Sequence, residues 1–205
     1  MGILKHTNIL ALCSLVFILS ANVNARPISW PGGNTYMYKS DSTKTSKNYH
    51  YSPSYKYSIG VEFVNDKYFK DEYMNFRGTY LLDRRNTKKS QRNFYITGAF
   101  SGKSSNNFFY GVHGDWETRR FFSSISYINK YTKLKNYTEK ELQLGVAPYL
   151  GEYGDIHTWV MMKAKRNTIN DDWETYPFIK LFTGDYMLEI GNKNSHWDLH
   201  FMARF

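Results

Sequence analysis

The chain ends in the stretch HWDLHFMARF, residues 196–205, in which bulky apolar side chains alternate with mostly polar ones. A repeat of two residues is that of a β-strand, because successive side chains of a strand point to opposite faces of its sheet. The stretch therefore predicts a strand with one polar and one apolar face, and the apolar face carries Trp197, Leu199, Phe201, Ala203 and Phe205.

The same alternation recurs upstream, interrupted by short polar segments rich in Gly, Asn, Asp and Lys. It predicts nine further strands, at residues 57–65, 74–84, 92–102, 108–118, 121–132, 142–151, 157–167, 174–184 and 186–192. No helical period of usable length appears, so the chain is predicted to be all-β with about ten strands. Merging weak segments would leave eight strands, and a hairpin within residues 35–54 would make twelve.

The first 25 residues have the pattern of a secretory signal peptide. Lys5 precedes an apolar run from Ile9 to Leu19, and Val23 and Ala25 place small residues before a cleavage site. We therefore expect export and cleavage after Ala25. The predicted organisation is a signal peptide over residues 1–25, a linker or extra hairpin over 26–56, and a β-barrel over 57–205.

Composition excludes several classes of protein. A chain of 205 residues predicts one domain, and a mean hydropathy of −0.59 rules out a bundle of membrane helices. One cysteine rules out a disulfide scaffold or a thiolate metal cluster, and 18% aromatic residues argue against disorder. The net charge is +9, but nucleic acid is not expected as a partner of an exported protein.

Three architectures share this alternation: a soluble sandwich, a lipocalin-like barrel and a membrane barrel. In the first two the apolar face fills the core, whereas in the third it contacts lipid. The apolar faces here hold too much aromatic and aliphatic volume for a ten-stranded interior, and aromatic residues flank many segments, as at Tyr57, Trp116 and Tyr186. The pattern favours a closed antiparallel up-and-down transmembrane β-barrel, with a soluble exported barrel as the alternative.

The exported chain with a terminal phenylalanine on an alternating strand resembles small outer-membrane β-barrel proteins of Gram-negative bacteria. The stretches GVAPYLGEYGDIHTW (145–159) and HYSP (50–53) are also similar to such proteins. The resemblance implies a monomer in outer-membrane lipid, with turns 84–92, 118–120, 152–156 and 184–186 in the periplasm. It also implies an assembly signal, read by the barrel-assembly machinery, at Trp197, Leu199, Phe201 and Phe205. A resemblance in architecture implies location and fold, not activity.

The polar faces predict a charged lumen. Its expected members carry both signs: Glu62, Arg77, Asp83, Asp115, Glu117, Lys130, Lys163, Lys165, Lys180, Glu189, Asp198 and Arg204. A barrel of this size has an interior largely occupied by side chains, so the mixed charges favour a cross-linked polar plug. We therefore predict a structural or envelope-interaction role without catalysis or cofactor. A small-solute or metal-ion channel, or a transport accessory, is the first alternative.

A lipid-modifying enzyme is the second alternative. Neither GxSxG nor HExxH occurs in the sequence. Asp155 and His157, near Glu152, could orient a catalytic base, but they lie in a predicted turn without a partnered nucleophile.

Metal binding is a weaker possibility. Imidazole and thioether groups suit copper, and six such residues can face the lumen: His113, His157, His200, Met161, Met187 and Met202. No two of them show a recognised ligand spacing, so no metal site is predicted.

Overall fold

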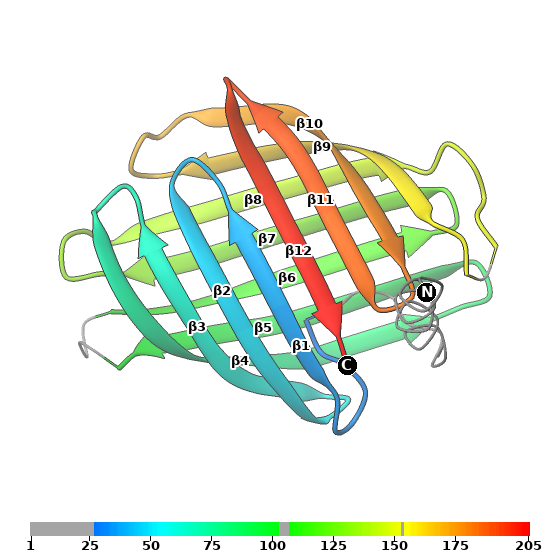
Figure 1. Ribbon diagram of the computed structural model, residues 1–205, viewed down its shortest axis with the longest axis horizontal. Coiled ribbons are helices and arrows are strands. Elements are labelled where there is room, and N and C mark those ends of the chain that lie inside the picture. The colour runs from blue at the N-terminus through cyan, green and yellow to red at the C-terminus, as the bar shows by residue number, and fades with distance from the viewer. Residues whose placement is uncertain (1–26, 103–106, 153) are drawn as a thin grey trace, which may run out of the picture.

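The computed structural model describes residues 27–102, 107–152 and 154–205, and the predicted signal peptide lies outside them. The described chain forms a closed barrel of antiparallel strands (Figure 1). No helix in this part of the chain is long and apolar enough to cross a membrane. The strands are β1 (Asn34–Ser40), β2 (Lys44–Ser54), β3 (Tyr57–Asp66), β4 (Asp71–Asn86), β5 (Ser90–Ser101), β6 (Phe108–Thr118), β7 (Phe121–Tyr131), β8 (Tyr137–Val146), β9 (His157–Asn167), β10 (Trp173–Thr183), β11 (Tyr186–Lys193) and β12 (His196–Arg204).

Each strand pairs with its neighbour in sequence, and β1 pairs with β12 to close the sheet. The predicted fold class is confirmed, and the strand number is twelve, the upper value of the expected range. The two added strands, β1 and β2, come from residues 34–54. The inward residues of β2 are Lys44, Ser46, Asn48, His50 and Ser52, and the outward ones include Lys47, Tyr49 and Tyr51. Both faces carry polar side chains, so this segment shows little contrast in hydropathy between them.

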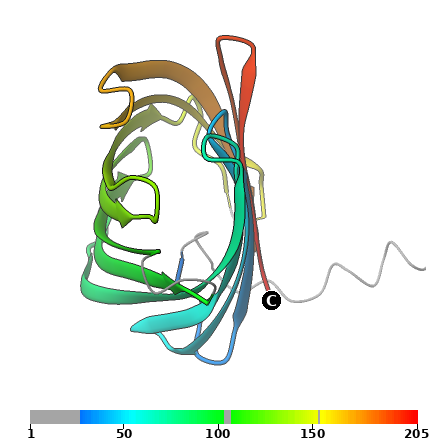
Figure 2. The same cartoon turned by 90° about the vertical axis from the view of Figure 1, so that its left-hand side faces the viewer.

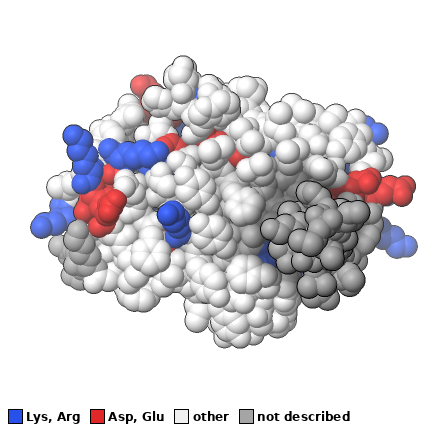
Figure 3. Space-filling view, in the orientation of Figure 1, with Lys and Arg blue, Asp and Glu red and all other residues white. Residues whose placement is uncertain are grey.

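The apolar face points outward, as predicted. Phe100, Ile125 and Trp197 expose 61%, 63% and 61% of their surface, whereas the inward Thr35 and Ser58 expose none. Figure 3 shows a broad uncharged surface, with charged side chains gathered mainly toward the two ends. An outward apolar belt around a polar interior is the arrangement of a transmembrane barrel.

The barrel has two different ends. The terminal end carries residues 34 and 204 and the connections 55–56, 87–89, 119–120, 147–156 and 184–185. The loop end carries the connections 41–43, 67–70, 102–107, 132–136, 168–172 and 194–195. Figure 2 views the barrel from the loop end and shows that its cross-section is elongated.

The segment before β1 folds against the inner wall at the terminal end. Ile28 is buried in a cluster with Leu81 and Tyr95. The Ser29 amide donates a hydrogen bond to the Ser52 hydroxyl at 3.0 Å. These contacts narrow the lumen at the terminal end.

Candidate functional site: the lumen and its loop-end mouth

The lumen holds a cavity of about 310 Å³. All twelve strands contribute to its lining, which runs from Glu117 and Phe122 near the terminal end to Asn107 and Thr132 near the loop end. The barrel interior therefore holds a cavity that side chains of every strand border.

Ion pairs cross-link the wall of this cavity. Lys163 of β9 lies 2.8 Å from Asp198 of β12, two strands beyond its direct partner β10. The Tyr176 hydroxyl also donates to Asp198. Lys180 lies 3.4 Å from Glu189 on the neighbouring strand. Pairing of this kind satisfies buried charges that would otherwise be costly to desolvate.

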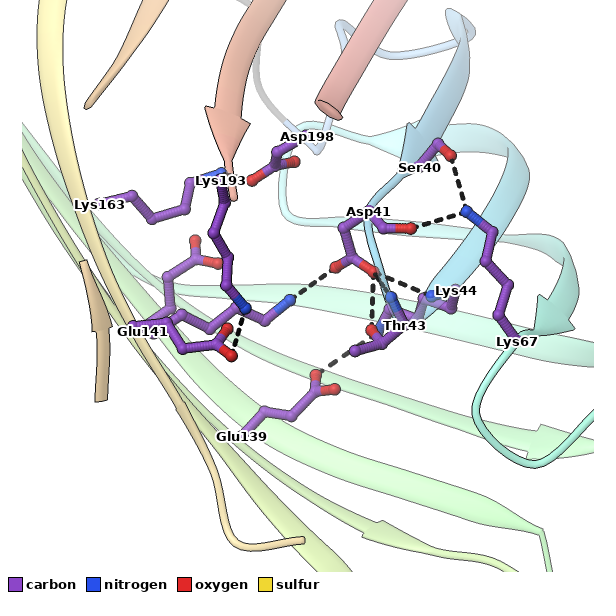
Figure 4. Close-up of polar contacts among 12 residues, drawn as sticks. Ser40, Asp41, Thr43, Lys44, Lys67, Glu139, Glu141, Lys163, Lys193 and Asp198 are labelled. Atoms are coloured by element: carbon purple, nitrogen blue, oxygen red, sulfur yellow. Dashed lines mark hydrogen bonds and ion pairs between the residues drawn. The ribbon is translucent and has the colours of Figure 1, made fainter. Parts of the chain in front are cut away.

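At the loop end, a second set of ion pairs crosses the barrel. The β1–β2 turn carries Asp41, whose carboxylate accepts a hydrogen bond from Lys165 of β9 at 2.6 Å. Lys44, where β2 begins, lies 3.4 Å from Glu139 of β8, and Lys130 of β7 lies 2.8 Å from the same carboxylate. We call these five residues the mouth cluster, of which Figure 4 labels Asp41, Lys44 and Glu139. Because β1–β2 and β8–β9 are far apart in the strand order, the cluster ties two walls of the barrel together.

The turn itself is built around Asp41. Its Oδ1 accepts hydrogen bonds from the amides of Thr43 and Lys44 and from the Thr43 hydroxyl, at 2.7–2.9 Å. Its Oδ2 is left to meet Lys165. Burial alone would raise the pKa of Asp41, but the charges of Lys165 and Lys44 outweigh burial and hold this pKa below its ordinary value. The carboxylate therefore stays ionised and keeps the mouth cluster intact at neutral pH.

Most of the predicted luminal residues do line the cavity. They are Glu62, Arg77, Asp115, Glu117, Lys130, Lys163, Lys165, Lys180, Glu189 and Asp198. Arg204 is buried instead near the terminal end, 3.4 Å from Asp185 and over the ring of Trp30. Burial raises the pKa of Asp185, which lies in the β10–β11 turn, and the charge of Arg204 partly offsets this effect.

Asp83 does not face the lumen, and its prediction was wrong. A β-bulge between Leu81 and Asp83 adds one residue to β4 opposite β5. A single added residue moves the following side chains to the other face of the sheet. Asp83 therefore lies outside with Arg92, and both side chains are more than half exposed.

Several luminal residues were missed. Lys39, Asp41 and Lys44 belong to the stretch 35–54, which the sequence predicts only as a linker or extra hairpin. Glu139 falls in the segment KLKNYTEKE, which the sequence predicts as a loop, although β8 begins at Tyr137. The alternation of Tyr137, Glu139 and Glu141 with Thr138 and Lys140 was the available signal, and it was faint because both faces are polar.

Trp197 and Phe205 are exposed on the outer face, and Leu199 and Phe201 are partly buried there; their reading by an assembly machinery stays a prediction. Asp155 accepts a hydrogen bond from the Glu152 amide, so it caps a turn. His157 stacks on Phe182 with ring centroids 4.7 Å apart. No group of three or more His, Cys, Asp or Glu residues suited to a metal occurs in the described ranges.

Comparison with known proteins gives structural matches but no sequence match. No family model matches the chain, and no curated protein is similar to it. Two solved structures of KdgM porin, one in complex with disordered oligogalacturonate, match with a TM-score of 0.51 and 9% identity. Each match covers 84% of this chain and 98% of the porin chain. At this identity the likeness shows the fold, a closed antiparallel β-barrel like that of these porins.

Proposed function

We propose that this chain is a narrow outer-membrane channel for small polar solutes, with the terminal end facing the periplasm. The observation that carries the proposal is the cavity lined by all twelve strands. This proposal departs from the plugged, purely structural role expected from the sequence, because a lumen packed full with side chains would hold no such cavity. The similarity to porins also supports a channel over an enzyme.

Oligosaccharides are the solute class we favour. The cavity wall mixes both signs of charge with aromatic rings such as Phe109, Phe122 and Tyr73. Such a wall offers hydrogen bonds to hydroxyl groups and flat apolar surface to sugar rings, and a few well-placed polar groups set specificity in such sites. One of the similar porins was solved with an acidic oligosaccharide, oligogalacturonate.

Lys39 supplies a cation for an acidic sugar. It lines the cavity and is exposed to it. Among the described residues, no carboxylate lies within ion-pair distance of Lys39, whereas Lys163, Lys165 and Lys180 are each paired. A solute carboxylate can therefore pair with Lys39 without displacing an existing partner.

Solute passage through reconstituted liposomes tests the proposal. We expect small saccharides to enter liposomes that hold the folded chain, and oligogalacturonate to block their entry. Lys39→Gln should weaken this block about tenfold, the effect of losing one charge-assisted contact. Lys47→Gln is the matched control, because Lys47 lies on the adjacent strand and faces outward. Liposomes that admit no saccharide although the barrel is folded would refute the proposal.

A further inference from the structure

Three methionines lie side by side on the inner wall. Met37 of β1 is directly opposite Met202 of β12, which is directly opposite Met187 of β11. They pack against one another and expose only 3%, 4% and 3% of their surface. All three border the luminal cavity. Side chains directly opposite each other on antiparallel strands have Cβ atoms about 4.5–5.5 Å apart, so the three flexible thioethers share one place on the wall.

The surroundings of this methionine trio are polar. The next inward residues along the same strands are Lys39, His200 and Glu189, which lie opposite one another in a second row. Thioether sulfur is a soft ligand, and soft ligands select Cu⁺ among biological metal ions.

The side chain of His200 offers a further metal ligand beside the methionine trio. Its Nδ1 lies 3.2 Å from Glu189 Oε2, while its Nε2 is buried and has no hydrogen-bond partner among the residues that the structure describes. With Nδ1 donating to the carboxylate, Nε2 keeps its lone pair free. A histidine that binds a metal through one nitrogen is usually oriented through the other by a carboxylate in this way. His200 and Met202 are two residues apart on the same face of β12.

We infer that Met37, Met187, Met202 and the Nε2 of His200 form a binding site for a soft monovalent metal ion, Cu⁺ or its analogue Ag⁺. All four ligands are neutral, as suits an ion of single charge. Phe182 packs against the trio and covers it on one side. Glu189 is paired with Lys180, so its charge is largely compensated. The ammonium group of Lys39, beside His200, repels a bound cation, so replacing Lys39 by a neutral residue should strengthen metal binding.

Met161 is the matched control for the trio. It is also buried, at 2% exposure, but it packs with Trp159, Phe178 and Ala147, with no second methionine in that cluster. A single thioether makes a weak site, so Met161 should not respond to the metal at low concentration. Met162 is exposed on the outer face and serves as a second reference.

Methyl NMR of the folded full chain, labelled at methionine methyl groups and titrated with silver nitrate in chloride-free buffer, tests the inference. Silver is used because it needs no reductant. We expect the methyl signals of Met37, Met187 and Met202 to shift together and to saturate at one Ag⁺ per chain. The signals of Met161 and Met162 should not move over that range. Equal shifts of all methionines, or no shift of the trio, would overturn the inference.

Four variants test which side chains bind the metal ion. Replacing all three methionines by leucine conserves volume and should weaken Ag⁺ binding by at least about tenfold, whereas Met161→Leu should leave it unchanged. Lys39→Gln should tighten binding, and His200→Gln should weaken it. Retention of wild-type affinity in the triple variant would count against the site. If the triple variant does not fold, the wild-type methyl shifts still decide the question.

Discussion

Asp41→Asn isolates the contact that ties the two walls of the mouth together. An asparagine keeps an oxygen in place of Oδ1, so the hydrogen bonds that build the β1–β2 turn persist. It replaces Oδ2, which meets Lys165, by an amide nitrogen that cannot accept a hydrogen bond. The variant therefore removes the cross-barrel ion pair and leaves the turn.

The size of the effect follows from burial. Removing one partner of a buried ion pair costs about 3–5 kcal/mol, whereas exposed pairs contribute about 1 kcal/mol or less. The Asp41 and Lys165 side chains expose 17% and 14% of their area. Since the exposed part contacts the water of the mouth, we expect a loss of about 2–3 kcal/mol in the free energy of unfolding.

The same pair predicts a pH dependence. The pKa of Asp41 is lower in the folded barrel than in the unfolded chain. Its contribution to stability is therefore complete above the ordinary pKa of an aspartate and is lost as the pH falls below that value. Asp41→Asn should be less stable than the wild type at neutral pH, and the difference should shrink in strong acid.

The assays are urea unfolding in detergent and single-channel conductance in planar bilayers. Asp41→Asn should lower the unfolding midpoint and raise the conductance, because the mouth is no longer tied across. Asp66→Asn is the control: Asp66 caps the neighbouring β3–β4 turn by accepting from the Tyr68 and Phe69 amides, and it forms no cross-barrel ion pair among the described residues. If both variants behave alike in both assays, the mouth cluster does not tie the walls together.

Three further outcomes are expected. Gly60→Ala should destabilise the barrel by about 1–3 kcal/mol in urea unfolding, because the added Cβ would collide with the Tyr49 carbonyl. Gly78→Ala should not destabilise it, because the added Cβ would make only an ordinary contact there. Equal unfolding midpoints for the two variants would contradict this prediction. Ile125→Lys, on the outer face in the middle of β7, should cost about 2–4 kcal/mol in a lipid bilayer; an unchanged midpoint would mean that this face does not contact lipid. Phe205→Ala should reduce the fraction of chain that is recovered as folded barrel from the outer membrane, and full recovery would show that no assembly signal depends on it.

Hydropathy alternation was sufficient for the strands with contrasting faces. β3 was predictable because Ile59 and Phe63 point outward while Ser58 and Glu62 face the lumen. β2 was predicted only as part of a possible hairpin, because Lys47 on its outer face is no more apolar than Asn48 on its inner face. Patterning therefore detects a strand only where its two environments demand different chemistry.

The sequence predicts a charged lumen, but it does not predict which luminal side chains lie next to one another. The sign and identity of most inward charges followed from the period of two, yet the bulge before Asp83 breaks that period without an obvious signal. The methionine trio depends on pairing between residues at opposite ends of the chain, as for Met37 and Met202. Strand register across a barrel closure cannot be obtained from one sequence, because it is set by long-range pairing.

The single-channel conductance of the wild-type chain tests the central claim most directly. A detergent-extracted preparation whose gel band shifts only on boiling would first establish a closed barrel. In planar bilayers of neutral lipid and potassium chloride, we predict discrete current steps from this preparation, because the cavity is lined by all twelve strands. A heat-modifiable barrel that inserts into the bilayer and carries no current would contradict the proposed channel and favour a lumen plugged by side chains.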